Sequence, residues 1–185
     1  MALARFISLI GHPMLVMPLA ALLAARASGI DRAHALAVSA AIAFVGLLVL
    51  GFSGLQVRRG RWRHVDASGK DERRGLNIFL LPLFALASVL AWWRLGVSPL
   101  PVALMLAAGV VALAILLSAW CKLSLHMAFV SFAALIPGSW SALLAFGLLG
   151  VAVAWSRLAL HRHVRLDLFA GLLAGVAAGI IYQCT

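Results

Sequence analysis

Long apolar segments alternate with short polar ones along the chain. About 20 mostly apolar residues cross the roughly 30 Å of a bilayer's hydrocarbon core. Backbone groups in lipid must pair within their own segment, and the period-2 alternation of a barrel strand is absent, so these segments are predicted to be helices. The fifth segment is short, and a Pro-Gly-Ser turn at 137–139 separates it from the sixth. The predicted spans are 4–25, 34–56, 76–95, 100–120, 124–137, 139–156 and 166–183.

Composition supports a membrane location. The chain has 185 residues, of which 65% are hydrophobic and 11% charged, whereas a soluble domain carries about 25% charged residues. No Gly/Ser-rich linker divides the chain, so residues 1–185 are predicted to form a single all-α membrane domain of about six to seven spans. The first apolar run continues beyond the h-region of a signal peptide, and we interpret it as a retained span.

The polar residues fall into three clusters. The first is the loop 57–75, with the sequence VRRGRWRHVDASGKDERRG, the second is KLSLH at 122–126, and the third is RLALHRHVRLD at 157–167. Two predicted spans separate each cluster from the next, so all three emerge on the same side of the membrane. This parity predicts that they contribute to one shared site.

The third cluster carries the most specific motif, which reads Ser156-Arg157, five residues, His163, three residues, Asp167. His163 and Asp167 are four residues apart and therefore neighbours on one helical face. A carboxylate there can accept a proton from one imidazole nitrogen and leave the other free to attack. Arg157 offers a planar fork for two phosphate oxygens.

This S-R-x5-H-x3-D pattern resembles the third signature of the type 2 phosphatidic acid phosphatase superfamily. Lys122 to His126 resembles the second signature, P-S-G-H, although leucines replace its proline and glycine, so that only Ser124 and His126 match. By this resemblance, His126 is the general acid that protonates the leaving oxygen, and Ser124 contacts the phosphate. Lys122 is expected to help neutralise the phosphoryl group.

The superfamily's first signature, K-x6-R-P, has no strict match. The stretch DASGKDERRG at 66–75 looks like a divergent form of it. Arg73 or Arg74 is then the phosphate-binding arginine and Lys70 the accompanying lysine. The alternative interpretation of this stretch is an ordinary basic loop.

The resemblance implies a metal-independent phosphatase with a helical catalytic core and a phosphohistidine intermediate. No cofactor or metal is expected, because the five acidic residues build no two-metal carboxylate cluster. The expected substrates are lipid phosphates, including polyprenyl mono- and diphosphates, and no nucleic-acid partner is expected. The alternative is a catalytically degenerate protein that binds or transports anionic lipid.

Basic residues are distributed unevenly between the two predicted faces. Of the fifteen Lys and Arg, twelve lie on the side of the motifs and three on the other side, Arg26, Arg32 and Arg94. The positive-inside rule therefore places the motif face in the cytoplasm, and the resemblance implies a bacterial inner membrane. Many bacterial relatives are understood to act on the outer face, but the charge count belongs to this sequence and we favour it.

Three smaller features complete the picture. Glycines at 171, 175 and 179 predict close helix packing, and small-residue faces would also allow a homodimer. His12 lies beside Pro13 within the first span, where a packing role or a bonded helix kink is expected. Cys121 and Cys184 have no partner at metal-ligand spacing and are expected to be small apolar residues.

Overall fold

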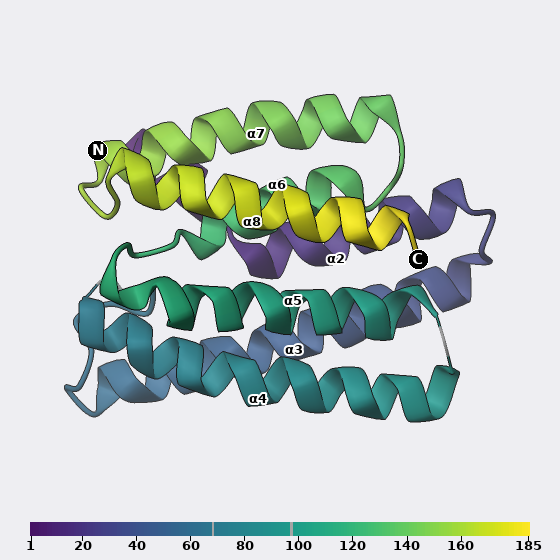
Figure 1. Ribbon diagram of the computed structural model, residues 1–185, viewed down its shortest axis with the longest axis horizontal. Coiled ribbons are helices and arrows are strands. Elements are labelled where there is room, and N and C mark those ends of the chain that lie inside the picture. The colour runs from purple at the N-terminus through teal and green to yellow at the C-terminus, as the bar shows by residue number, and fades with distance from the viewer. Residues whose placement is uncertain (68, 97) are drawn as a thin grey trace.

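The chain folds into a bundle of α-helices that run roughly parallel or antiparallel to one another (Figure 1). The computed structural model describes residues 1–67, 69–96 and 98–185, and these ranges contain no β-strand. One residue of the polar loop, Ser68, lies outside them. The helices are α1 (Ala2–Ile10), α2 (Pro13–Ala27), α3 (Arg32–Arg58), α4 (Lys70–Leu95), α5 (Pro99–Leu116) with the 3-10 turn η1 (Leu117–Ala119), α6 (Leu125–Leu135), α7 (Trp140–Ala159) and α8 (Arg165–Gln183).

The predicted all-α fold is confirmed for the described residues, and its long apolar helices are consistent with a membrane protein, but the predicted number of spans is not confirmed. Among the described residues, five helices are long and apolar enough to cross a membrane, namely α3, α4, α5 with η1, α7 and α8. The bent pair of α1 and α2 passes the same test only when taken together, as a broken span or a re-entrant loop. The predicted span 124–137 is the 11-residue helix α6. At 1.5 Å per residue it is about 16 Å long, roughly half of the hydrocarbon thickness. The chain before it, residues 121–124, has no regular structure.

The break between α1 and α2 has a local cause. Pro13 lacks an N–H and its ring clashes with a preceding helical turn, so a helix ends before it and a new one begins with proline in its first turn. The two helix axes differ by 43°, and the Nδ1 of His12 accepts a hydrogen bond from the Met14 N–H at 3.3 Å. The predicted bonded kink at His12 is therefore confirmed.

Helix α6 forms the centre of the bundle. All its residues from Leu125 to Ala134 are buried, as expected for a helix whose side chains are apolar around most of its circumference. It packs against α2, α5, α7 and α8.

Helix α8 approaches α6 through the three predicted glycines. A Cβ on Gly171 would lie 2.5 Å from the Ser124 carbonyl oxygen, and one on Gly179 would lie 2.5 Å from a methyl carbon of Leu135. A Cβ on Gly175 would overlap the carbonyl of Ala128. Close packing by small residues is thus confirmed, and it holds the start of α6 against the start of α8.

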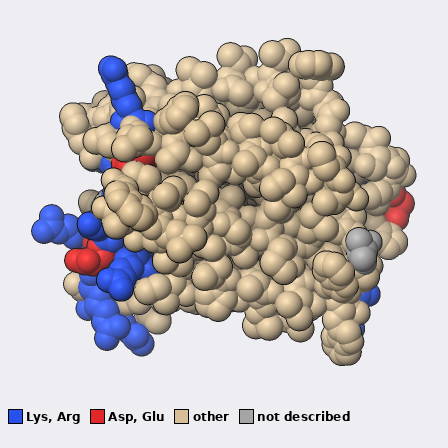
Figure 2. Space-filling view, viewed as in Figure 1, with Lys and Arg blue, Asp and Glu red and all other residues tan. Residues whose placement is uncertain are grey.

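Charged side chains gather at one end of the bundle (Figure 2). This end contains the end of α3, the start of α4, the end of α7 and the start of α8 (Figure 1). We call it the charged end. The candidate site lies there.

Candidate active site

His163 and Asp167 form a buried pair where α7 passes into α8. His163 lies in the connection, and Asp167 is in the first turn of α8, where its Oδ2 accepts the Val164 N–H at 3.2 Å. The same oxygen is 3.2 Å from Nδ1 of His163. Among the described residues, Nε2 of His163 has no hydrogen-bond partner, although it is buried. The predicted contact between His163 and Asp167 is present, although His163 precedes α8 and does not share a helical face with Asp167. One nitrogen is held and the other is left for a ligand.

The segment before α6 is attached to this pair through its backbone. Lys122 N–H donates to Asp167 Oδ1 at 2.8 Å, and Ser124 N–H donates to the Asp167 carbonyl oxygen at 3.0 Å. Lys122 Nζ also donates to the carbonyl of Arg162 at 3.3 Å. The Ser124 hydroxyl is fully buried and caps α6 by accepting the Met127 N–H at 3.4 Å. These bonds join the second and third polar clusters.

Two arginines carry buried donors beside the pair. The side chain of Arg157 is 0% exposed, and its Nη1 donates to the Ser8 hydroxyl at 2.9 Å and to Asp66 Oδ2 at 2.7 Å. Its Nε and Nη2, like Nε and Nη2 of Arg73, are buried with no partner in the described part of the chain. A buried donor without a partner is costly. Four such donors in one place are therefore typical of a site for an anion.

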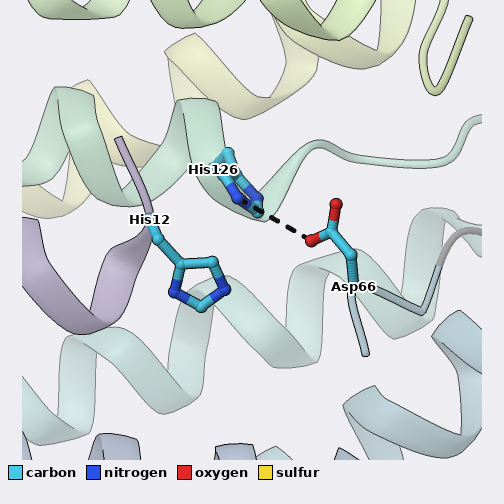
Figure 3. Close-up of side chains that lie close together, drawn as sticks. All are labelled: His12, Asp66 and His126. Carbon is cyan, nitrogen blue, oxygen red and sulfur yellow. Dashed lines mark ion pairs between the residues drawn. The ribbon is translucent and has the colours of Figure 1, made fainter. Parts of the chain in front are cut away.

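Asp66 belongs to the same cluster although it comes from the loop between α3 and α4. Its Oδ2 accepts from both Arg157 and Arg162, and its Oδ1 is 3.8 Å from His126 Nε2. Figure 3 shows this carboxylate pointing towards His126, with the His12 ring close to both. The rings of His12 and His126 meet edge to face, with centroids 4.9 Å apart. The three polar clusters therefore converge, as their parity predicts.

The electrostatic environment sets the charges of the loop residues. Burial alone would raise the pKa of Asp66, but His126, Arg157 and Arg162 outweigh it and hold the pKa of this carboxyl well below its usual range. Burial lowers the pKa of His163 far below the usual imidazole value, and the neighbouring Arg73, Arg157 and Lys122 lower it further, while the bond to Asp167 opposes them only in part. Asp66 is thus ionised and His163 neutral at neutral pH.

His12, Asp66 and His126 also form a group of metal-ligand type. One potential ligand atom from each residue lies within 4.8 Å of the others, and two histidines with a carboxylate are a donor set that zinc accepts. Yet Asp66 already bonds two arginines, and Arg73 lies within electrostatic range of it. A divalent cation would be repelled by these guanidinium groups. The charge of the surroundings therefore favours an anion over a metal ion.

Seven of the nine residues predicted for the site come together, and two do not. Those that meet are His163, Asp167, His126, Arg157, Ser124, Lys122 and Arg73. Lys70 and Arg74 are exposed. Successive residues on a helix point about 100° apart, so Arg73 faces inwards with Leu76, Asn77 and Leu80 on its own side of α4, and Arg74 does not.

Three members of the cluster, Asp66, Arg162 and His12, are not among the residues that the sequence predicts for the site. A histidine at membrane depth is a functional candidate by default, and that signal was available for His12. Asp66 and Arg162 stand in loops among several other charged residues, and no spacing rule singles them out.

An apolar pocket opens next to the cluster. His12, Asp66, Arg73 and His126 line its polar part, and the remainder is lined by apolar side chains of α2, α3, α4, α5 and α6, such as Leu80, Phe84, Leu104 and Phe129. Helix α3 packs mainly against α2, and α4 packs mainly against α5, whereas α3 and α4 contact each other only slightly. A molecule with a charged head and an apolar tail matches this division.

The fold and the site together define an all-helical protein, with the long apolar helices of an integral membrane protein and a buried histidine–carboxylate pair among cations. No protein-family model, curated protein or solved structure matches the chain. Its function must therefore be inferred from its own residues.

Proposed function

We propose that this protein is a membrane lipid phosphatase that removes phosphate from a lipid or polyprenyl phosphate through a phosphohistidine at His163. One observation carries the proposal. The Nδ1 of His163 is held by Asp167, while its buried Nε2 has no partner in the described residues and lies within electrostatic range of Arg73, Arg157 and Lys122. A neutral imidazole with a free nitrogen beside cations is suited to attack a phosphate.

In the proposed reaction, Nε2 of His163 forms a bond to phosphorus while the bond from phosphorus to the lipid oxygen breaks. His126 donates a proton to that oxygen, and the lipid alcohol leaves. Water then attacks the phosphohistidine with His126 as the base, and inorganic phosphate and free His163 result. Asp167 stabilises the positive charge that develops on the imidazole. Arg73, Arg157 and Lys122 stabilise the charge on the phosphoryl oxygens.

The apolar pocket supports a lipid as the substrate. It begins at the polar cluster and continues between helices that are apolar enough to lie in a bilayer. A phosphate head can then bind at the charged end while the tail stays in an apolar environment. The resemblance of residues 156–167 to the type 2 phosphatidic acid phosphatase motif points to the same class of substrate.

The test compares two histidines that are two residues apart. We would purify the wild type, His163→Asn and His161→Asn in detergent with EDTA, and measure phosphate released from phosphatidic acid, phosphatidylglycerol phosphate and polyprenyl mono- and diphosphates. His161 is exposed and has φ +52, a conformation that asparagine tolerates, so its substitution is a matched control. We expect His163→Asn to lose at least about 1000-fold in kcat and His161→Asn to keep wild-type turnover.

Three outcomes would contradict the proposal. Phosphate release that persists in His163→Asn would exclude this nucleophile, and release that stops in EDTA and returns with zinc would indicate a metal-dependent reaction. Binding of lipid phosphates without any release would instead support the catalytically degenerate lipid-binding protein.

A further inference from the structure

Asp66 occupies the position where the proposed reaction requires a phosphoryl group. Its carboxylate accepts hydrogen bonds from two arginines and faces the imidazole that is proposed to protonate the leaving oxygen. Charge-assisted bonds from guanidinium groups are also the usual means of binding phosphate oxygens. Asp66 therefore uses donors that a bound phosphate needs.

The donors that Asp66 leaves unused indicate a larger anion. Nε and Nη2 of Arg73 and Nε and Nη2 of Arg157 are all buried without a partner in the described residues. A carboxylate has two oxygens, and both already face Arg157, Arg162 or His126. A phosphoryl group, with its additional oxygens, is able to reach donors that the carboxylate does not.

The charges of the cluster lead to the same conclusion. Arg73, Arg157, Arg162 and Lys122 carry four positive charges, and Asp66 and Asp167 carry two negative ones, which leaves an excess of two positive charges. A phosphate dianion would neutralise that excess. A divalent cation at His12, Asp66 and His126 would double it.

From these observations, and resting on the proposed function, we propose that Asp66 is an internal anion that holds the arginine cluster in the unliganded protein and competes with the substrate's phosphate for it. Asp66 then determines the specificity of the site. A ligand binds only if it interacts with Arg157 and Arg162 more strongly than the Asp66 carboxylate does. Phosphate esters meet this requirement as dianions, and lipids with a single carboxylate do not.

The experiment measures equilibrium binding of inorganic phosphate to the purified full-length chain in detergent with EDTA, by calorimetry. The variants are Asp66→Asn, which keeps the shape of the side chain but removes its charge, and Asp71→Asn, an exposed acid at the start of α4, as the matched control. We expect Asp66→Asn to bind phosphate at least about tenfold more tightly than the wild type, equivalent to about 1.4 kcal/mol. Asp71→Asn is expected to bind like the wild type.

A second variant keeps the test valid if Asp66→Asn does not fold. Asp66→Ser also removes the charge, and it is expected to show the same tighter binding. Phosphate affinity that is unchanged or weaker in both variants would overturn the inference. So would zinc binding by the wild type that is lost in Asp66→Asn, because Asp66 would then be a metal ligand.

Phosphate binding requires no turnover, so this inference and the proposed function fail separately. Tighter phosphate binding by Asp66→Asn in a protein that releases phosphate from no lipid would support the role of Asp66 and contradict the phosphatase. Turnover by the wild type with unchanged phosphate affinity in Asp66→Asn would do the reverse.

Discussion

At the scale of single residues, burial determines what the polar groups of this site are able to do. His163 is buried in the connection between α7 and α8, beside three cations and one carboxylate. Placing a positive charge there is unfavourable, so the pKa of this imidazole falls and the neutral form persists in mild acid. A neutral imidazole is the form that the proposed attack on phosphorus requires.

The pH dependence of kcat/KM tests this argument. The acid limb of the wild type is expected below pH 6.5, the usual pKa of histidine, because folding lowers the pKa of His163. Lys122 contributes to that lowering, so Lys122→Met should move the acid limb to higher pH by up to about one unit. Lys70→Met is the control, because Lys70 is exposed at the start of α4, and it should leave the limb unchanged.

The same shift affects stability with a definite sign. The unfolded chain binds a proton at His163 near pH 6.5, and the folded chain binds it only at lower pH. The resulting stabilisation is complete above pH 6.5 and is lost as the pH falls towards the folded pKa. For the kinetic test, an acid limb of kcat/KM at or above pH 6.5 in the wild type would contradict the proposed environment of His163.

At the scale of elements, the contact between α6 and α8 determines the geometry of the site. His126 is in the first turn of α6, and Asp167 is in the first turn of α8. The glycines of α8 let its backbone approach that of α6 closely, and the Lys122 and Ser124 N–H groups bond Asp167 at the same junction. Separating these helices would therefore move both halves of the proposed catalytic machinery apart.

Gly175→Ala tests the role of this helix contact. The added Cβ would overlap the Ala128 carbonyl, and overpacking of this kind typically destabilises by about 1–3 kcal/mol. Gly147→Ala in α7 is the matched control, because nothing lies within 4 Å of its Cβ. It should be neutral or should stabilise by up to about 1 kcal/mol, since alanine favours helices over glycine.

Both variants would be compared by thermal unfolding in detergent and by turnover. Gly175→Ala should unfold at a lower temperature and lose activity, while Gly147→Ala should retain both. Equal stability of the two variants would show that α6 and α8 do not depend on this close approach.

At the scale of the whole molecule, the charged end defines an orientation in the membrane. Arginines and lysines concentrate there (Figure 2), and the positive-inside rule predicts that this end faces the cytoplasm. The chain carries a natural reporter for each end. Cys121 lies beside the site, whereas Cys184 is exposed just after α8, at the opposite end (Figure 1).

Labelling of spheroplasts with a membrane-impermeant maleimide tests this orientation. The Cys121→Ser variant leaves Cys184 as the single thiol, and we expect it to be labelled without permeabilisation. Cys121→Ser combined with Cys184→Ser is the unlabelled control. If Cys184 reacts only after the membrane is permeabilised, the charged end faces outwards and the proposed site acts on lipids of the outer leaflet.

Local spacing accounts for the parts of the fold and site that could be predicted from the sequence. Apolar runs identify the long helices, since the length needed to cross a bilayer is set by its thickness. The four-residue spacing of His163 and Asp167 predicts their contact, and Nδ1 of His163 lies 3.2 Å from Oδ2 of Asp167, although His163 precedes α8 and is not part of it. The glycines of α8 likewise indicate a close helix contact before any partner is known.

Only the tertiary structure decides which remote groups meet. Asp66 bonds Arg157, which is 91 residues away in the sequence. The ring of His12, at the break between α1 and α2, contacts the ring of His126. Arg73 faces the site and Arg74 does not because of the way α4 is rotated about its axis in the bundle. Helix α6 is short because residues 121–124 before it have no regular structure. The sequence by itself determines contacts within a turn of helix, because backbone geometry sets them. Packing between helices determines the others, including the position of Asp66 among the arginines.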